Sequence, residues 1–149
     1  MHDDEPANSG TKLPRYGSYQ VLHPLGSGGM SSVFKAVHVE TGHEVALKVL
    51  PLIKAANPIG IQRFLREARS AEALQDPNIV SIYDRGVDNG RHYLVLEYVD
   101  GADLHEYVQS RGPLSVAEAI RVVRQVALGL AYAASRGLVH RDIKPSNIL

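Results

Sequence analysis

The chain has 149 residues, of which 44% are hydrophobic and 21% are charged. This composition fits one globular domain, or one domain and part of another. Sixteen Lys and Arg balance sixteen Asp and Glu, so no net charge attracts nucleic acid or an anionic membrane, and we expect no nucleic-acid partner. The absence of cysteine excludes disulfides and thiolate chemistry.

The first residues of the chain are polar and acidic, whereas a signal peptide begins with basic residues and continues with apolar ones. No apolar run approaches the roughly 20 residues that span a bilayer. These features predict a cytoplasmic location and no membrane segment within the 149 residues, and they leave open a membrane anchor beyond residue 149. Residues 1–17 show no apolar period, so we expect a flexible leader there.

From Tyr19 onward, short β-rich segments alternate with turns that are rich in Gly or contain Asn-Gly. The turn signals lie at residues 26–29, 41–42 and 89–90. The strands that the pattern predicts cover residues 19–24, 33–39, 45–50, 79–84 and 93–98. Together these segments indicate an antiparallel meander of about five strands.

Three segments have the spacing of helices. Residues 61–74 carry apolar side chains at helical intervals before Asp76-Pro77 ends the pattern. Residues 103–109 read as a short helix, and Ser115 with Glu118 forms a capping box that opens a long helix ending near Gly137. The apolar stripe of this helix consists of Ile120, Val123, Val126, Ala127, Leu130 and Ala134.

The order of these elements predicts an α+β chain with three parts: a sheet lobe over residues 18–98, a hinge over residues 97–101, and a helical lobe over residues 102–149. The stripe of the long helix needs a helical lobe to cover it, and little of such a lobe is present. We therefore expect the isolated chain to be poorly soluble or to self-associate.

A glycine-rich segment reads Gly-Ser-Gly-Gly-Met-Ser-Ser-Val over residues 26–33, with Ser31 where a third glycine would complete GxGxxG. An ordinary Gly-rich hairpin turn is one interpretation. A dinucleotide-binding loop would be followed by a helix, whereas residues 33–39 are strand-like. The context therefore favours a loop inside a β-hairpin, which can fold over the phosphates of a nucleotide and donate backbone N–H groups.

A lysine stands among apolar neighbours in the predicted strand 45–50, where alternation places Ala46 and Lys48 on one face. Burying an unpaired ammonium is costly, so Lys48 needs an anion unless it reaches solvent from an edge strand. Glu67 is the candidate partner, because it follows Phe64 by three residues and leans toward the apolar stripe of its helix. The alternative is a solvated Glu67 that pairs with neighbouring arginines and contributes under about 1 kcal/mol.

The last ten residues read His-Arg-Asp-Ile-Lys-Pro-Ser-Asn-Ile-Leu. Phosphoryl transfer requires a carboxylate beside the attacking hydroxyl, a cation that neutralises the transferring group, and a metal ligand nearby. Asp142, Lys144 and Asn147 supply these three types of side chain within six residues. We expect His140 to have a packing role rather than to act as a base.

Taken jointly, these motifs resemble the eukaryotic-type protein kinase superfamily over residues 19–149, and most closely the bacterial serine/threonine kinases. The resemblance rests on LGSGGMSSV, VALK ending at Lys48, RFLREA containing Glu67, LEYV at residues 96–99, and HRDIKPSNIL. It implies a protein-kinase-like α+β fold, with a five-stranded antiparallel N-lobe sheet, one N-lobe helix and the first helices of a truncated C-lobe.

The resemblance also implies an ATP-dependent serine/threonine protein kinase that uses Mg²⁺ and transfers the γ-phosphoryl group of ATP to Ser or Thr hydroxyls of a protein substrate. Asp142 would be the catalytic base. Lys144 would neutralise the γ-phosphate, and its presence resembles serine/threonine rather than tyrosine kinases. Asn147 would bind a magnesium ion.

The implied nucleotide site draws on the rest of the chain. The loop that covers the phosphates would contain Gly26, Ser27, Gly28, Gly29, Met30 and Ser31. Lys48, oriented by Glu67, would contact the α- and β-phosphates. The adenine would be enclosed by Leu25, Val33, Ala46 and Leu149. The backbone of Glu97 and Val99 would bind the adenine edge, Leu96 would be the gatekeeper, and Asp103 would bind the ribose.

The DFG motif, the activation segment and the APE motif of this family do not occur in the 149 residues. We therefore expect a fragment of a kinase that is inactive alone. A second hypothesis is that the chain is a noncatalytic module that binds nucleotide or regulates another protein. A third, nicotinamide-dinucleotide binding, is disfavoured by the strand that follows the glycines.

Overall fold

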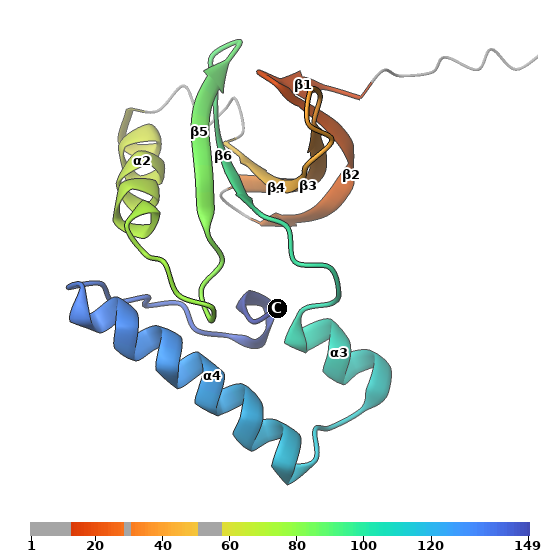
Figure 1. Cartoon of the computed structure of the whole chain (residues 1–149), viewed down its shortest axis with the longest axis vertical. Helices are drawn as coiled ribbons and strands as arrows, with labels where there is room; N and C mark the ends of the chain where they lie inside the picture. The colour runs from red at the N-terminus through yellow and green to blue at the C-terminus, as the bar shows by residue number, and fades with distance from the viewer. Residues whose placement is uncertain (1–12, 29–30, 51–57) are drawn as a thin grey trace, which may run out of the picture.

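A computed structural model describes residues 13–28, 31–50 and 58–149. A curved sheet with one helix beside it occupies one end of the molecule, and the remaining helices occupy the other, so the α+β class is as predicted (Figure 1). The elements, in chain order, are β1 (Arg15–Tyr16), β2 (Tyr19–Gly28), β3 (Ser31–His38), β4 (Glu44–Val49), α2 (Pro58–Glu72), β5 (Ile82–Asp88), β6 (Arg91–Glu97), α3 (Leu104–Arg111), α4 (Val116–Ser135) and the 3₁₀ helix η1 (Pro145–Asn147).

Within the described residues, the sheet has six antiparallel strands in the order β1-β2-β3-β4-β6-β5. The predicted five-strand meander is therefore wrong at both ends of the sheet. At one end, β4 is followed in the chain by α2 and then β5, yet its neighbour in the sheet is β6, and β5 forms the edge beyond β6. At the other end, β1 adds a strand that was not predicted. β5 also begins at Ile82 rather than Ile79, since the N–H of Ile79 donates to the carbonyl of Asp76 in a turn, 3.0 Å away.

The first strand lies within residues 1–17, for which the sequence predicts a flexible leader. Arg15 pairs with Gln20, and Tyr16 pairs with Tyr19. The N–H of Gly17 donates to the carboxylate of Asp88, 2.9 Å away at the far end of β5. Tyr16 is buried. The ordered sheet therefore starts before residue 18, because this short segment gains a buried aromatic ring and a bond across the sheet.

Alternation along β4 divides the sheet lobe into two cores. Val45, Leu47 and Val49 point into one core, and the even-numbered residues point to the opposite face. The first core also contains Tyr16, Val21, Ala36, Tyr93 and Val95. The second core contains Leu50, Phe64, Ala68 and Leu94, and it lies between the sheet and α2. As a result, Ala46 and Lys48 lie on the face against which α2 packs.

Both predicted ends of the long helix α4 are present. At the start, the hydroxyl of Ser115 accepts the N–H of Glu118 at 3.3 Å, and the carboxylate of Glu118 accepts the N–H of Ser115 at 2.9 Å. The Ser115 hydroxyl also donates to the Glu118 carboxylate at 2.6 Å, and this bond, followed by the one from the Ser115 N–H, lowers the pKa of Glu118. At the end, Gly137 has φ of 78° and donates to the carbonyl of Ala134, while Leu138 donates to that of Ala133. This is a Schellman motif.

One side of α4 rests on the loop that follows α2 (Figure 1). Gly129 is buried against this loop, where a Cβ atom would lie 3.0 Å from the carbonyl oxygen of Asn78. The hydroxyl of Tyr132 accepts the N–H of Gln75 at 3.4 Å. Gly129 therefore sets how closely α4 approaches the sheet lobe, since a larger side chain would meet backbone there.

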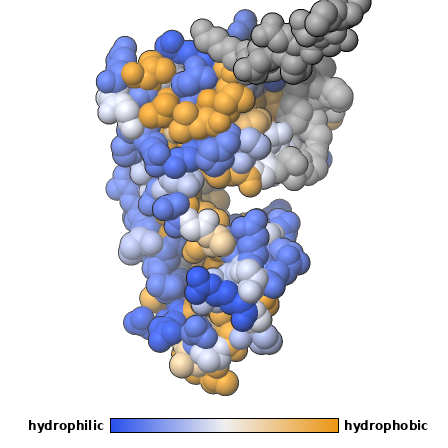
Figure 2. Space-filling model, turned by 90° about the vertical axis from the view of Figure 1, so that its right-hand side faces the viewer, coloured by the Kyte–Doolittle hydropathy of each residue, from blue (hydrophilic) through white to orange (hydrophobic). Residues whose placement is uncertain are grey.

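The other side of α4 is exposed. Val116, Ile120 and Val123 are 77%, 62% and 64% exposed, and Ala119, Ile120, Val123 and Ala127 line a shallow groove with Arg124. Hydrophobic surface is visible at the lower end of the molecule, where α4 begins (Figure 2). In the described part of the chain, no helix is long and apolar enough to cross a membrane.

Packing at Tyr93 gives a test of the sheet. A Cβ atom at Gly86 would lie 2.3 Å from the hydroxyl oxygen and 2.4 Å from Cζ of Tyr93. We expect Gly86→Ala to lower the free energy of unfolding by about 1–3 kcal/mol, because the ring must shift inside a packed core. The midpoint of thermal unfolding, followed by circular dichroism, measures this. Gly26→Ala is the control, since nothing lies within 4 Å of its Cβ position; equal midpoints would contradict the packing.

The exposed stripe of α4 gives a second test. We expect the double variant Ile120→Lys with Val123→Glu to self-associate less than the unchanged chain, because it removes two apolar side chains from the exposed face. Sedimentation velocity over a range of concentrations measures the association. Arg124→Gln, on the same helix, is the control for altered charge. A chain that is already monomeric at high concentration would refute the expectation.

Candidate functional site

Four residues named by the motifs share one face of the sheet. Val33 in β3 lies directly opposite Lys48 in β4, and Ala46 lies opposite Leu96 in β6. Residues directly opposite each other in an antiparallel pair project from the same face. The register therefore brings the predicted adenine-enclosing residues Val33 and Ala46 together with the predicted phosphate-binding Lys48 and gatekeeper Leu96.

Lys48 occupies an interior strand, with β3 on one side and β6 on the other. This position excludes the alternative of a lysine on an edge strand. The helix α2 packs on the same face through Phe64 and Ala68, which contact Leu94. The backbone of Glu67 belongs to α2, but its side chain lies outside the described atoms, so the Lys48–Glu67 pair stays a prediction.

The glycine-rich segment joins β2 to β3. Gly26 pairs with Val33, and Gly28 pairs with Ser31, so a strand follows the glycines and the dinucleotide arrangement with a helix is excluded. Leu25 falls at a register shift between Pro24 and Gly26, where it is the extra residue of a bulge and is exposed. The predicted site residues Gly29 and Met30, together with the side chain of Ser27, lie outside the described part of the chain.

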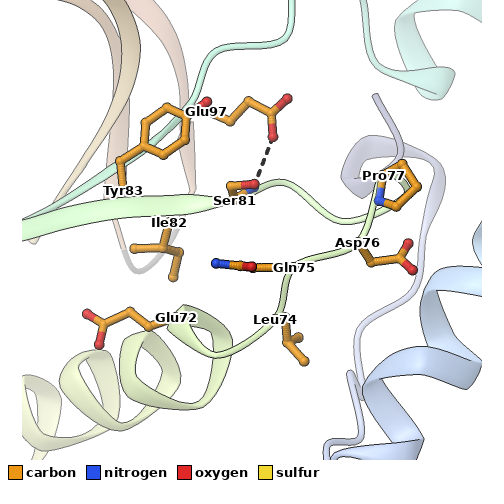
Figure 3. A pocket seen from close by; sticks show the side chains of 9 residues that line it. All are labelled: Glu72, Leu74, Gln75, Asp76, Pro77, Ser81, Ile82, Tyr83 and Glu97. Atoms are coloured by element: carbon orange, nitrogen blue, oxygen red, sulfur yellow. Dashed lines mark hydrogen bonds between the residues drawn. The ribbon is translucent and has the colours of Figure 1, made fainter.

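Ser81, which belongs to none of the sequence motifs, holds Glu97 at the end of β6, where the hinge begins. The N–H of Glu97 donates to the carbonyl of Ser81 at 2.9 Å, and Oε2 of Glu97 accepts the N–H of Ser81 at 3.1 Å (Figure 3). Both bonds tie Glu97, one of the two residues predicted to bind the adenine edge, to the segment before β5. The partnership depends on where the chain runs before β5, so no local pattern could have revealed it. The next predicted hinge contact, Val99, is exposed.

A cavity of about 420 Å³ lies beside this contact, between the end of α2, the loop after it and β5 (Figure 3). Its lining consists of Glu72, Leu74, Gln75, Asp76, Pro77, Ser81, Ile82, Tyr83 and Glu97. Apart from Glu97, it includes none of the residues predicted to bind a nucleotide. The cavity is therefore separate from the face that carries Ala46 and Lys48.

The same face carries a cation that no motif marks. Lys35 lies directly opposite Ala46. Its Nζ lies 2.9 Å from Oε1 of Glu44 and 4.3 Å from the centre of the Tyr98 ring in the hinge. One signal could have placed Lys35 here: it follows Val33 by two residues and so shares its face. The contact with Tyr98 depends on strand pairing and could not be read from the sequence.

The three predicted catalytic-loop residues meet around one carboxylate. Nζ of Lys144 lies 3.1 Å from Oδ2 of Asp142. Nδ2 of Asn147 donates to the carbonyl oxygen of Asp142 at 2.8 Å and to its Oδ2 at 3.2 Å. The bond from Lys144, with a smaller effect from Asn147, lowers the pKa of Asp142 below its ordinary value. Asp142 is therefore an ionised carboxylate at neutral pH, as a proton acceptor must be.

Local backbone geometry brings these side chains together. Arg141 has φ of 64°, in the left-handed region that few non-glycine residues adopt. The one-turn helix η1 begins at Pro145, and the N–H of Asn147 donates to the carbonyl of Lys144 at 2.9 Å. This turn returns Asn147 to Asp142. The predicted packing role of His140 is wrong here: its side chain is exposed, and Nδ1 accepts the N–H of Asp142 at 3.3 Å.

The catalytic loop is tied to the segment after the hinge. The N–H of Leu104 donates to the carbonyl of Ile148 at 2.8 Å. The preceding residue, Asp103, caps α3 by accepting the N–H of Glu106 at 2.8 Å. Leu149, the predicted floor of the adenine site, therefore lies beside the start of α3, and it is 63% exposed. The chain ends beneath the sheet (Figure 1), and a notch separates the sheet from the helices below it (Figure 2).

The loop can supply part of a magnesium site. Both polar contacts of the Asn147 side chain with Asp142 use its nitrogen, which leaves the amide oxygen for a cation. Amide and carboxylate oxygens are the ligands that Mg²⁺ prefers. In the described part of the chain, however, no group of three or more His, Cys, Asp or Glu residues could hold a metal ion. The fit is therefore that of a partial ligand set.

Asp103 allows its capping role to be separated from the predicted contact with ribose. We expect Asp103→Ala to lower the free energy of unfolding by about 0.5–2 kcal/mol, and Asp103→Asn to preserve it, because Asn caps helices as well as Asp does. Thermal unfolding of the two variants measures the difference. Equal midpoints would show that the cap contributes nothing. Weaker ATP binding by Asp103→Asn, at unchanged stability, is the result expected if the carboxylate also binds the ribose.

Comparison with known proteins identifies the family of the chain. Residues 19–149 match the sequence model of the family described as "Protein kinase domain". The match covers all but the first 18 residues, so the chain belongs to the protein kinase domain family. Kinases of this family use ATP and Mg²⁺.

Among its relatives, the chain is 46% identical over 133 residues to the serine/threonine-protein kinase PrkC of Bacillus subtilis, covering 89% of the chain and 20% of PrkC. It is 39% identical over 135 residues to PknD of Mycobacterium tuberculosis, covering 91% and 20%. The chain thus spans about a fifth of these relatives. The crystal structure of the M. tuberculosis PknI kinase domain, at 36% identity, superposes with a TM-score of 0.76 over 91% of this chain and 56% of that one.

Proposed function

We propose that these residues form the nucleotide and catalytic-loop parts of an ATP-dependent serine/threonine protein kinase, which transfers the γ-phosphoryl group of ATP to Ser or Thr hydroxyls of a protein substrate. The observation that carries the proposal is the convergence of Lys144 and Asn147 on the carboxylate of Asp142. A cation, an amide and an ionised carboxylate within one short loop are the groups that the transfer requires.

In this proposal Asp142 accepts the proton of the attacking hydroxyl. Lys144 lowers the pKa of Asp142 further and so favours its ionised state, and it can turn to the γ-phosphate when the nucleotide is bound. Asn147 offers its amide oxygen to magnesium, which would neutralise charge on the phosphates as the bond to the leaving group breaks. The choice of Ser and Thr over Tyr as acceptors rests on Lys144 and on the names of the relatives.

The sheet lobe supplies the nucleotide contacts. Val33 and Ala46 share a face with Lys48. One surface of the sheet can therefore bind both the adenine, at Val33 and Ala46, and the phosphates, at Lys48. The loop between β2 and β3 would cover the phosphates with backbone N–H groups. Glu67 would orient Lys48 from α2, Leu25 and Leu149 would close the adenine site, and the carbonyl of Glu97 with the N–H of Val99 would bind the adenine edge.

A second function is favoured by one specific observation. The 149 residues contain no Asp-Phe-Gly sequence, the motif whose aspartate holds a magnesium ion in this family. We propose that the chain by itself binds ATP without transferring its phosphate. Magnesium-dependent phosphorylation of a generic protein substrate by the 149 residues alone would refute this second proposal and leave the first intact.

The first proposal is tested by Asp142→Asn in the full-length gene product. We expect phosphate transfer from radiolabelled ATP to a protein substrate to fall on the order of 100-fold or more, because the amide cannot accept the proton. ATP binding, measured by titration calorimetry, should be retained, which separates catalysis from folding. Glu106→Gln, an exposed carboxylate on α3, is the control for loss of a negative charge. Unchanged turnover in Asp142→Asn would contradict the proposal that the protein is a kinase with Asp142 as its catalytic base.

A further inference from the structure

Lys35 joins the sheet to the hinge beside the adenine face, and none of the roles assigned above involves it. It projects from β3 directly opposite Ala46, so it belongs to the same face as Val33, Ala46 and Lys48. The side chain of Lys35 is 17% exposed. The charged end of a side chain that is mostly covered gains from partners close by, since burying a charge without them is unfavourable.

Two groups meet the Lys35 ammonium. Oε1 of Glu44, at the start of β4, lies 2.9 Å away, and the centre of the Tyr98 ring lies 4.3 Å away. The bond to Glu44 raises the pKa of Lys35, so the side chain is a cation throughout the neutral range. The Tyr98 hydroxyl in turn donates to Oδ1 of Asp100 at 3.1 Å. One cation therefore connects β3, β4 and the hinge.

The two contacts differ in environment. Glu44 is half exposed, so water and salt screen its attraction for Lys35. The ring of Tyr98 is partly buried, and cation–π attraction grows as the cation loses water. Loss of Lys35 would therefore remove a contact made by the hinge itself, whereas Glu44 lies outside the hinge and acts on it only through the lysine.

The position of Tyr98 gives the contact its consequence. Tyr98 stands between Glu97 and Val99, the two residues whose backbone groups would bind the adenine edge. The N–H and side chain of Glu97 are anchored to Ser81, which holds the hinge from one side. The Tyr98 ring is held by Lys35 from β3. The pairing of Glu97 with Val45 places the start of the hinge beside β4, and these two contacts hold the residues that follow.

We propose that Lys35 is a positioning residue for adenine: through the ring of Tyr98 it holds the hinge backbone at the place where Glu97 and Val99 meet the base. This inference rests on the proposed function, because it concerns the same nucleotide site. In this inference Lys35 does not contact the phosphates. Loss of the Lys35 side chain should therefore weaken nucleotide binding only because the hinge is less well held.

The test measures ATP binding to the 149-residue chain by titration calorimetry. We expect Lys35→Met to raise the Kd about 3- to 10-fold, the range that a partly covered cation–π contact supports. Lys35→Arg, which keeps a cation over the ring, should bind ATP like the unchanged chain. Glu44→Gln should have a smaller effect than Lys35→Met. Arg85→Met is the matched control, since Arg85 is also ion-paired, to Glu72, but lies on β5, away from the hinge contact.

A double-mutant cycle identifies the route. If Lys35 acts through Tyr98, then Lys35→Met should add little to the effect of Tyr98→Leu, because residues joined by one contact are not additive. Additive effects would overturn the proposal, as would a Kd for Lys35→Met within 2-fold of the unchanged chain. Thermal unfolding checks each variant, and Lys35→Gln replaces Lys35→Met if the latter does not fold.

Hydrogen exchange of the hinge, residues 96–101, supplies a readout that needs no ligand. Lys35→Met should speed exchange at the hinge amides and leave α4 unchanged, since local opening follows the loss of local contacts. Hinge exchange equal to that of the unchanged chain would overturn the proposal even if ATP binding fell. If the unchanged chain does not bind ATP, the second proposal, that the chain by itself binds ATP, fails, and hinge exchange still decides whether Lys35 holds the hinge.

Discussion

The alternation of side chains along β4 is the constraint on which the rest of the structure depends. Leu47 is completely buried in one core, and its neighbours Ala46 and Lys48 project from the opposite face. Because the period of a strand is two residues, a shift of one position would exchange the two faces and bury Lys48 in the apolar core. The pairing of β4 with β3 and β6 prevents this shift, so the same register sets both the packing of the core and the residues of the face that we propose to bind the nucleotide.

The two halves of the site are organised in different ways. The catalytic loop arranges itself within ten residues, through bonds among Asp142, Lys144 and Asn147 that bridge at most five positions. The sheet half depends on partners far apart in the chain, such as Ser81 with Glu97 and Lys35 with Tyr98. The bond from Leu104 to Ile148 then joins the loop to the segment after the hinge.

The accuracy of sequence-based prediction follows the same division. Both ends of α4 could be predicted, because a capping box and a C-terminal glycine act within a few residues. The fold class followed from the change between strand and helix periods. β1 could not be predicted, since a two-residue strand has no period, and its order comes from Tyr16 in the core and the bond from Gly17 to Asp88. The order of β5 and β6 in the sheet could not be predicted either, because strand order depends on residues far apart in the chain.

The sequence by itself determined the family and the α+β class and named the candidate residues of the catalytic loop, because these depend on residue types at short, defined spacings. Only the tertiary structure decided that Lys48 lies in an interior strand, that Glu97 is anchored to Ser81, and that Lys35 meets Tyr98. The physical reason is distance along the chain. Local bonds join residues that are close in the sequence, so a short sequence pattern can predict them. Contacts between strands arise from the packing of the whole sheet, so no single segment predicts them.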